Sequence, residues 1–419
     1  MRKWILCFLF VASPIVFGAE KQTHKYITLD QAIINVLEGN PSLSASEYEA
    51  KAAAARIRAA KQSPALYTSI EFQNFAGNGK YSGADNLEST LSLSQVLELG
   101  DKATLRGDLA KNKAILLRNE QSAKRLDLLS ETTKRFIHIV TDQERLAIAK
   151  DSLKLANQTL NVVKRRVNAG RTPNAELRRA KIALARKQLD LEHAEHELAT
   201  TRLKLITLWG KTQATFTAAK ASLFNVEKIM PFEVLTQLLE KNPDIVRFAT
   251  EKRLAKTRIQ LAQAKRQSNI EVSAGIRHFN LTDDSAFVLS LNVPFGSSSR
   301  AIPLVEEAEM LSLREPHVYE QRRLTLYATL FEVYQEIKHA IKAVTTLRTT
   351  IIPHAEQALL EYEKGYAVGR YSFLELTEAQ STLLSARREA VMAAANYHRH
   401  RAEIDRLTGT NINQPTQTP

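Results

Sequence analysis

The 419-residue sequence carries 58 lysines and arginines against 45 aspartates and glutamates, a formal charge of +13 at neutral pH. The basic residues are spread along the chain, and no glycine-rich phosphate loop, zinc spacing or aromatic-interleaved patch accompanies them. A solvated helical surface therefore explains the charge better than nucleic-acid binding does. No nucleophile, base or cofactor motif is present, so we expect a protein that is not an enzyme and that needs no cofactor.

Residues 1–19 have the composition of a secretory signal peptide. Arg2 and Lys3 precede an apolar stretch over residues 4–17, and two small residues follow it. This stretch is shorter than the roughly 20 apolar residues of a membrane-spanning helix, so we interpret it as a cleaved signal. No later stretch is long and apolar enough for such a helix, and any membrane crossing would have to use strands.

Four segments alternate between apolar and polar residues, which is the period of a β-strand. The first pair, residues 66–75 and 87–97, follows an Ala-rich helix expected at residues 40–62, and the second pair covers residues 270–277 and 287–293. Segments of about ten residues with one apolar face are typical of membrane strands that have lipid on one side and water on the other. A pair of soluble hairpins, each covered by a helix, is the alternative interpretation.

A long helix is predicted between residues 101 and 172, where no proline occurs. About 65 residues at 1.5 Å each give roughly 100 Å, a length that a duct across the periplasm needs and a globular core does not. Apolar residues recur at every seventh position on both sides of the turn that follows: Ile139, Leu146, Leu153, Leu160 and Val167, then Leu177, Leu184, Leu191, Leu198 and Leu205. This spacing predicts paired helices with a left-handed supercoil, although a generic coiled-coil hairpin would explain it equally well.

The chain is internally duplicated. A shift of 199 residues aligns residues 165–210 with residues 364–409 without a gap, and the alignment pairs a glycine at one turn with a glycine at the other. Two copies of about 200 residues exceed the 20–50-residue periods of solenoid repeats. We therefore interpret residues 20–211 and 229–409 as two structural repeats, each with a helix, two strands and a long helical hairpin.

The number of strands constrains the assembly. Four strands cannot close a barrel around water, and a lone four-stranded sheet would leave two unpaired edges, which lipid does not permit. Three chains would supply twelve strands, which can close. If the strands face lipid, the protein is expected to be a trimer.

Both turns carry one pattern, in which a glycine is followed by an acidic-apolar pair and then by alanine. The first copy is Gly170 with Glu176-Leu177 and Ala180, and the second is Gly369 with Glu375-Leu376 and Ala379. In this doubled pattern, and over nearly its whole mature length, the chain resembles the TolC-like outer membrane efflux protein family. Residues 94–102 look like the Leu-Glu-Leu-Gly-x-Lys segment of the heavy-metal, CzcC-like branch of that family.

The resemblance implies a mainly α fold with a small β portion. Long antiparallel helical hairpins would form a trimeric α-barrel tunnel, and four β-strands per chain would contribute to a 12-stranded outer-membrane β-barrel. Residues 212–228 would be an equatorial linker, and residues 410–419 a C-terminal tail. The protein would lie in the cell outer membrane, in contact with outer-membrane lipid, with a long periplasmic extension.

The resemblance also implies a function and partners. A homotrimer would dock on a periplasmic adaptor (membrane fusion) protein and an inner-membrane RND-type pump, and would passively conduct their cargo to the exterior. Heavy-metal cations are the expected cargo. The same type of duct exporting drugs or proteins is one alternative, and a secreted coiled-coil structural protein is another.

Four residues match the family's periplasmic gate by position. Glu375 and Glu378 correspond to an acidic ring, Tyr366 to a gate tyrosine, and Glu176 to the carboxylate that this tyrosine would bind. Like charges from three chains around one constriction would favour cations and raise some carboxyl pKa values. Exposed helix carboxylates and a seam aromatic are the plainer interpretation.

The two turns are also candidates for contact with the adaptor. Gly170 and Gly369 would permit the sharp reversal between helices, which is a backbone role. Arg171 and Arg370 follow them at the exposed tip, and solvated turn arginines are the alternative.

Histidine pairs occur in both halves, but they do not predict a metal site. His193 and His196 are three residues apart, and His398 and His400 are two apart. A metal site needs further ligands, and none is evident near either pair. We expect surface histidines.

Overall fold

The computed structural model describes residues 24–409, so the predicted signal peptide at residues 1–19 and the predicted tail at residues 410–419 lie outside the described residues. The described chain is mainly helical with a small β portion, which confirms the predicted fold class. Its strands are β1 (His24–Ile27), β2 (Leu66–Gln73), β3 (Glu88–Leu97), β4 (Phe216–Ala219), β5 (Ile270–Phe279) and β6 (Asp284–Asn292). Its helices are α1 (Leu29–Gly39), α2 (Pro41–Ala60), α3 (Lys102–Asn168), α4 (Asn174–Ile206), α5 (Phe232–Leu239), α6 (Pro243–Ala264), α7 (Ser297–Thr346), α8 (Ile352–Val368) and α9 (Phe373–Thr408).

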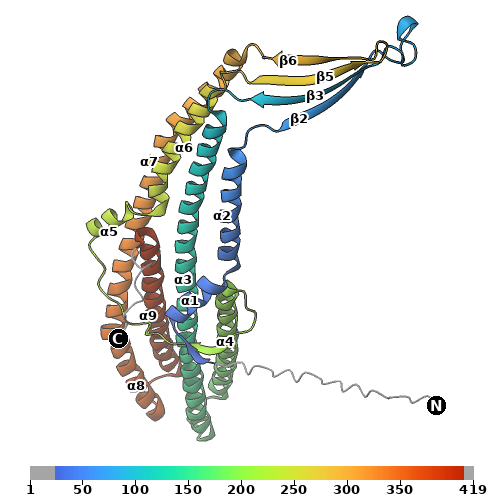
Figure 1. Ribbon diagram of the computed structural model, residues 1–419. Coiled ribbons are helices and arrows are strands. Elements are labelled where there is room, and N and C mark those ends of the chain that lie inside the picture. Colours follow the sequence, from blue (N-terminus) through green and yellow to red (C-terminus); the bar gives the residue numbers. More distant parts are fainter. Residues whose placement is uncertain (1–23, 410–419) are drawn as a thin grey trace, which may run out of the picture.

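The four predicted strands form one antiparallel sheet in the order β2-β3-β5-β6, at one end of an elongated molecule (Figure 1). The register places Ile70 opposite Leu91, Leu91 opposite Ile276, and Ile276 opposite Phe287. These four side chains form an apolar row across one face, and they are 53–91% exposed. The exposure contradicts the alternative of soluble hairpins that are each covered by a helix.

The opposite face of the sheet is polar, as the alternation predicted. All five charged residues of the four strands fall on it, namely Glu71, Glu88, Glu271, Arg277 and Asp284. Arg277 donates to Glu88 Oε2 and to Thr90 Oγ1, each at 2.9 Å. The ends of the strands differ slightly from the prediction, since β5 continues to Phe279 and β6 begins at Asp284.

The Leu-Glu-Leu-Gly-x-Lys segment fastens the sheet to the helices. The two carboxylate oxygens of Glu98 accept from Arg106 at 2.6 and 2.8 Å, and Arg106 also donates to the carbonyl oxygen of Gln62, just past α2. Lys102 is buried and donates to the carbonyl oxygen of Gln267, just past α6, at 2.6 Å. The segment therefore binds the start of α3 to the ends of α2 and α6.

The predicted long helix is confirmed by α3, whose 67 residues correspond to about 100 Å. It reverses into α4, and several of the sevenfold apolar positions form the seam between the two helices. Ile139, Leu198 and Leu205 are buried in one cluster, and Val167 and Leu177 pack on another nearer the turn. Among residues 24–409, no helix is both long and apolar enough to span a membrane.

The second hairpin is less regular than the first. A π-helical segment, Leu347–Ile351, separates α7 from α8. Pro353 lies two residues past the end of this segment. Because proline has no amide hydrogen, it interrupts the regular hydrogen-bond ladder, and a π segment is one way to absorb such a break. Arg348 within the segment lies over the ring of Phe224, 4.7 Å from its centroid.

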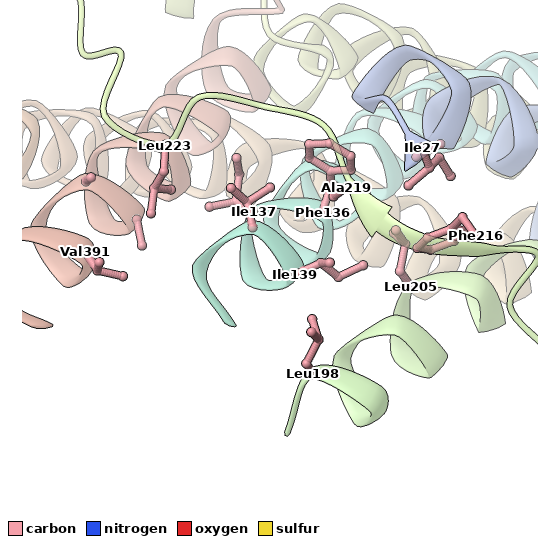
Figure 2. Close-up of a cluster of buried hydrophobic side chains, with 14 of the residues drawn as sticks. Ile27, Phe136, Ile137, Ile139, Leu198, Leu205, Phe216, Ala219, Leu223 and Val391 are labelled. Atoms are coloured by element: carbon pink, nitrogen blue, oxygen red, sulfur yellow. The ribbon is translucent and has the colours of Figure 1, made fainter. Parts of the chain in front are cut away.

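The largest core lies midway along the helices and joins both halves of the chain. Figure 2 shows side chains from α3, α4 and α9 meeting residues of two short strands, β1 and β4, which pair in parallel. The labelled members are Ile27, Phe136, Ile137, Ile139, Leu198, Leu205, Phe216, Ala219, Leu223 and Val391. The sequence did not predict β1 or β4, and β4 lies within the predicted linker at residues 212–228.

Two asparagines tie each half of the chain together in the same way. Asn242 caps α6 by accepting from the Asp244 N–H at 2.7 Å, and its Nδ2 donates to Leu407 O at 2.8 Å. Asn40 caps α2 and donates to Leu208 O at 2.6 Å. Both asparagines are buried. Each one therefore satisfies a helix start and the end of its hairpin together.

Asn242→Ala should destabilise the protein by about 1–3 kcal/mol, because it removes a helix cap and leaves a buried carbonyl oxygen without its donor. The unfolding midpoint in detergent measures this loss. Asn157→Ala is the matched control, since Asn157 is exposed on α3 and donates only to its own helix. Equal midpoints for the two variants would contradict the role given to Asn242.

Candidate gate at the helical turns

The two hairpins reverse through the same turn geometry. Gly170 and Gly369 adopt positive φ angles of 70° and 90°, a conformation that favours glycine. In the first turn the Arg171 N–H donates to Arg166 O at 2.9 Å, and in the second the Arg370 N–H donates to the equivalent carbonyl oxygen at 2.8 Å. These bonds close the ends of α3 and α8 in the manner of a Schellman motif.

The structure brings Tyr366 and Glu176 together. Tyr366 lies in the last turn of α8 and is only 1% exposed, whereas Glu176 lies in the first turn of α4. The tyrosine hydroxyl donates to Glu176 Oε2 at 3.0 Å. This bond links the second hairpin to the first at the turns.

The environment of Tyr366 keeps its hydroxyl protonated. Burial, and then the hydrogen bond to the Glu176 carboxylate, raise the pKa of Tyr366 to about 12. Both causes act in the same direction, because a phenolate would be poorly solvated and would face a negative charge. The hydroxyl is therefore a dependable donor at any physiological pH.

Glu375 and Glu378 lie close together on α9 but have different surroundings. Glu375 forms a capping box with Ser372, whose N–H and hydroxyl both donate to Glu375 Oε2 at 2.7 Å. These bonds hold the pKa of Glu375 below its ordinary value. Both glutamates are exposed and border a groove between α8 and α9. Glu375 thus has a structural role that the sequence analysis did not foresee, while the Glu378 carboxylate faces solvent.

Arg171 and Arg370 are exposed at the two turns. The charge around the turns is unequal, however. Residues 164–187 of the first hairpin hold nine lysines and arginines against one glutamate, whereas the aligned residues 363–386 hold two against three glutamates. One hairpin tip is strongly basic and the other is weakly acidic.

Arg166 is a residue that the sequence analysis missed. Its guanidinium lies over the Tyr366 ring, 4.5 Å from the centroid, and it donates to the backbone oxygen of Tyr366. The aligned position in the second repeat is Gly365, so the duplication breaks here. The mismatch between arginine and glycine, in two turns that otherwise align, was the signal that could have identified Arg166.

Polar contacts further from the turns also join the hairpins. Gln380 on α9 donates to Thr159 on α3 at 2.8 Å. Arg387 reaches Asp151 on α3 at 3.2 Å and Glu356 on α8 at 2.7 Å. The bond between Tyr366 and Glu176 is therefore one of several polar contacts that join the two hairpins along their length.

The histidine pairs lie away from the gate residues. His193 and His196 belong to α4, and His398 and His400 to α9. His398, expected as a surface histidine, is partly buried: its Nε2 bonds to the carbonyl oxygen of Leu223 at 2.9 Å, and burial lowers its pKa. Within residues 24–409, no group of three or more histidine, cysteine or acidic side chains is placed to hold a metal ion.

Comparison with known proteins gives matches along most of the chain. The sequence profile of the family described as outer membrane efflux protein matches residues 32–211 and 234–410. The cobalt-zinc-cadmium resistance protein CzcC of Cupriavidus metallidurans is 23% identical, over 91% of this chain and 90% of its own length. The outer membrane protein TolC of Escherichia coli is 19% identical, over 95% of this chain and 86% of its own length.

Solved structures show the same fold. The crystal structure of CusC superposes with a TM-score of 0.75 at 16% identity, covering 94% of this chain and 95% of that chain. The outer membrane protein VceC of Vibrio cholerae superposes with a TM-score of 0.73 at 17% identity, covering 91% and 96%.

The phenol of Tyr366 should titrate about 2 pH units above the ordinary tyrosine value near 10. Because its folded-state pKa is raised, the stabilisation is fully present up to about pH 10 and is lost as the pH rises toward 12. An alkaline ultraviolet titration, taken as the difference between the wild type and Tyr366→Phe, measures the pKa. Glu176→Gln should lower it, because the carboxylate is removed.

Tyr48→Phe provides the control for this titration, since Tyr48 is 70% exposed on α2. A Tyr366 transition that coincides with that of Tyr48 would show that burial and Glu176 do not act on the hydroxyl as described.

Proposed function

Because this chain belongs to the outer membrane efflux protein family, we propose that it is the outer-membrane channel subunit of a tripartite efflux system. In this role it passively conducts cargo delivered by an inner-membrane RND-type pump and a periplasmic adaptor. It lies in the cell outer membrane, with its helices extending into the periplasm. It catalyses no reaction, and its working parts are a pore and a gate.

The exposed apolar face of the sheet is the observation that carries this proposal. Phe287, Leu289 and Leu291 are 91%, 79% and 65% exposed on β6 alone. Burial in lipid would remove this surface from water at about 25 cal/mol per Å². A water-soluble coiled-coil rod would leave it exposed, so the fold disfavours a secreted structural protein.

The sheet edges support a homotrimer. Within residues 24–409, β2 and β6 each pair with only one strand. An unpaired backbone group in lipid costs several kcal/mol, so both edges require further strands. Three copies placed edge to edge supply twelve strands, and a barrel of twelve has no edge.

Heavy-metal cations are the cargo that we favour. The named relative CzcC is a cobalt-zinc-cadmium resistance protein. Residues 94–102, which resemble the heavy-metal branch, hold the start of α3: Glu98 accepts from Arg106 of that helix, and Lys102 donates to the backbone just past α6. The sequence of the segment supports membership of the heavy-metal branch. Its contacts are structural and do not involve the cargo. Export of drugs or proteins through the same duct remains the alternative.

The turns are proposed as the tip that meets the adaptor. Gly170 and Gly369 shape the two reversals, and Arg171 and Arg370 are exposed beside them. The basic tip of the first hairpin would attract an acidic surface on the adaptor. The periplasmic gate at the same end is assigned to Glu375, Glu378, Glu176 and Tyr366.

Neutralising Glu378 should weaken the preference of the pore for cations, because its carboxylate is free to face a permeating ion. The reversal potential of the purified trimer in a planar bilayer, under a salt gradient, measures this preference. Glu375→Gln should shift it as well, since the hydrogen bonds from Ser372 keep the exposed Glu375 carboxylate ionised.

Glu47→Gln is the control for the selectivity measurement, because Glu47 is exposed on α2 and pairs with Lys51. It should leave the reversal potential unchanged. If neither turn variant differs from this control, the acidic ring is not formed by these residues. A purified wild type that stays monomeric and soluble without detergent would rule out the channel itself.

Cells that lose this chain should become more sensitive to cobalt, zinc and cadmium salts than to organic drugs. Without this chain, the pump would still bind its substrate but would have no channel through which to export it across the outer membrane. Growth at graded concentrations, with and without the intact chain restored from a plasmid, measures the effect. Unchanged metal tolerance with lowered drug tolerance would assign the cargo to the alternative.

A further inference from the structure

Arg166 connects the two hairpins at their turns. It lies in the last turn of α3, and its guanidinium carbon is 4.5 Å from the centroid of the Tyr366 ring. Its Nη1 donates to the backbone oxygen of Tyr366, at the end of α8. Its Nε donates to Thr172 Oγ1 in its own turn at 3.0 Å. One side chain therefore touches the ring and the backbone of Tyr366 while anchored to the first hairpin.

Tyr366 is consequently held from two directions. Glu176 accepts from its hydroxyl at 3.0 Å, whereas Arg166 covers its ring and binds its carbonyl oxygen. The two contacts restrain different parts of the residue. The hydrogen bond to Glu176 fixes the tip of the side chain, and Arg166 fixes the helix end from which the side chain extends.

The chemistry of arginine suits this position. The last carbonyl groups of a helix carry partial negative charge, so a cation is favoured at the end of α8. A planar guanidinium can stack on an aromatic ring while its N–H groups donate in the plane of the group. Lysine could supply the charge and one donor, but it could not cover the ring in the same way.

The two turns are not equivalent at this position: the first turn contributes an arginine to the second, whereas the second turn has a glycine there. Gly365 occupies the position aligned with Arg166, and a Cβ there would lie 2.3 Å from the Tyr371 ring. Tyr371 also packs against Tyr362, with ring centroids 4.6 Å apart. The second turn is thus packed on itself, while the first turn supplies the arginine that contacts it.

We propose that Arg166 is a positioning residue for the gate, which keeps the end of α8 against α3 so that Tyr366 remains in reach of Glu176. The proposal rests on the gate assigned under the proposed function. It adds a residue to that gate, and it predicts that losing Arg166 opens the pore even though Tyr366 and Glu176 are both present.

The test is the open-to-closed ratio of single channels of the full-length trimer in planar bilayers. Arg166→Ala should raise this ratio roughly tenfold, the factor that corresponds to about 1.4 kcal/mol. Arg166→Lys should give an intermediate rise. Tyr366→Phe should open the pore as well, and combining it with Arg166→Ala should add less than the product of the single effects, because both act on one contact.

Arg165→Ala is the matched control. Arg165 is the neighbouring residue on α3, is exposed, and carries the same charge. It should leave the ratio unchanged. The thermal midpoint of the trimer should be the same for Arg165→Ala and Arg166→Lys, which separates positioning of the gate from a general loss of stability.

The outcomes distinguish two kinds of failure. If Tyr366→Phe and Glu176→Gln open the pore but both Arg166 variants behave like Arg165→Ala, the role of Arg166 is wrong and the gate stands. If Tyr366→Phe and Glu176→Gln leave a conducting pore unchanged, the gate assignment is wrong and Arg166 has nothing to position. Should Arg166→Ala fail to assemble, Arg166→Lys alone decides, and a wild-type ratio overturns the proposal.

Discussion

The backbone of the four-stranded sheet imposes the constraint on which the rest of the structure depends. Its apolar face is largely exposed, so water is an unfavourable environment for it. In the part of the chain that the structure describes, its outer strands, β2 and β6, each lack a neighbour on one side, so lipid is equally unfavourable for a single copy. Lipid becomes suitable only when other copies pair with both edges. In the proposed trimer the membrane and the neighbouring copies would meet both requirements, and the same assembly would bring the attached helices together.

The attachment of the helices differs between the two ends of the molecule. At the sheet, Arg106 and Lys102 bind the start of α3 to the ends of α2 and α6, and Lys102 is buried. At the turns, the two hairpins meet through a buried apolar cluster, which includes Val163 and Leu376, and through polar contacts around Tyr366. The turn glycines themselves are exposed. A gate at this end would therefore have to separate buried apolar side chains as well as break hydrogen bonds.

Long periodic features could be predicted from the sequence, whereas short and non-local ones could not. The alternation around Leu91 and Ile276 extends over about ten residues and gave both the strands and their faces. The four-residue strand β4 is too short to show a period, and it forms only because the core supplies a parallel partner. The proximity of Tyr366 and Glu176 came from a family resemblance, because nothing in their spacing places them together. Arg166 was missed because its partner lies 200 residues away.

The net charge of the chain is a poor guide to the ion that such a duct would admit. The total is +13, yet the polar face of the sheet carries four carboxylates and a single arginine, and that arginine is paired with Glu88. The basic residues gather instead on the helices, above all around the first turn between residues 164 and 187. Charge at a pore lining acts on a permeating ion at short range, while charge beyond about 8–10 Å of water is screened at physiological ionic strength. The positions of the carboxylates along the pore, rather than the net charge of the whole chain, therefore determine whether cations or anions are favoured.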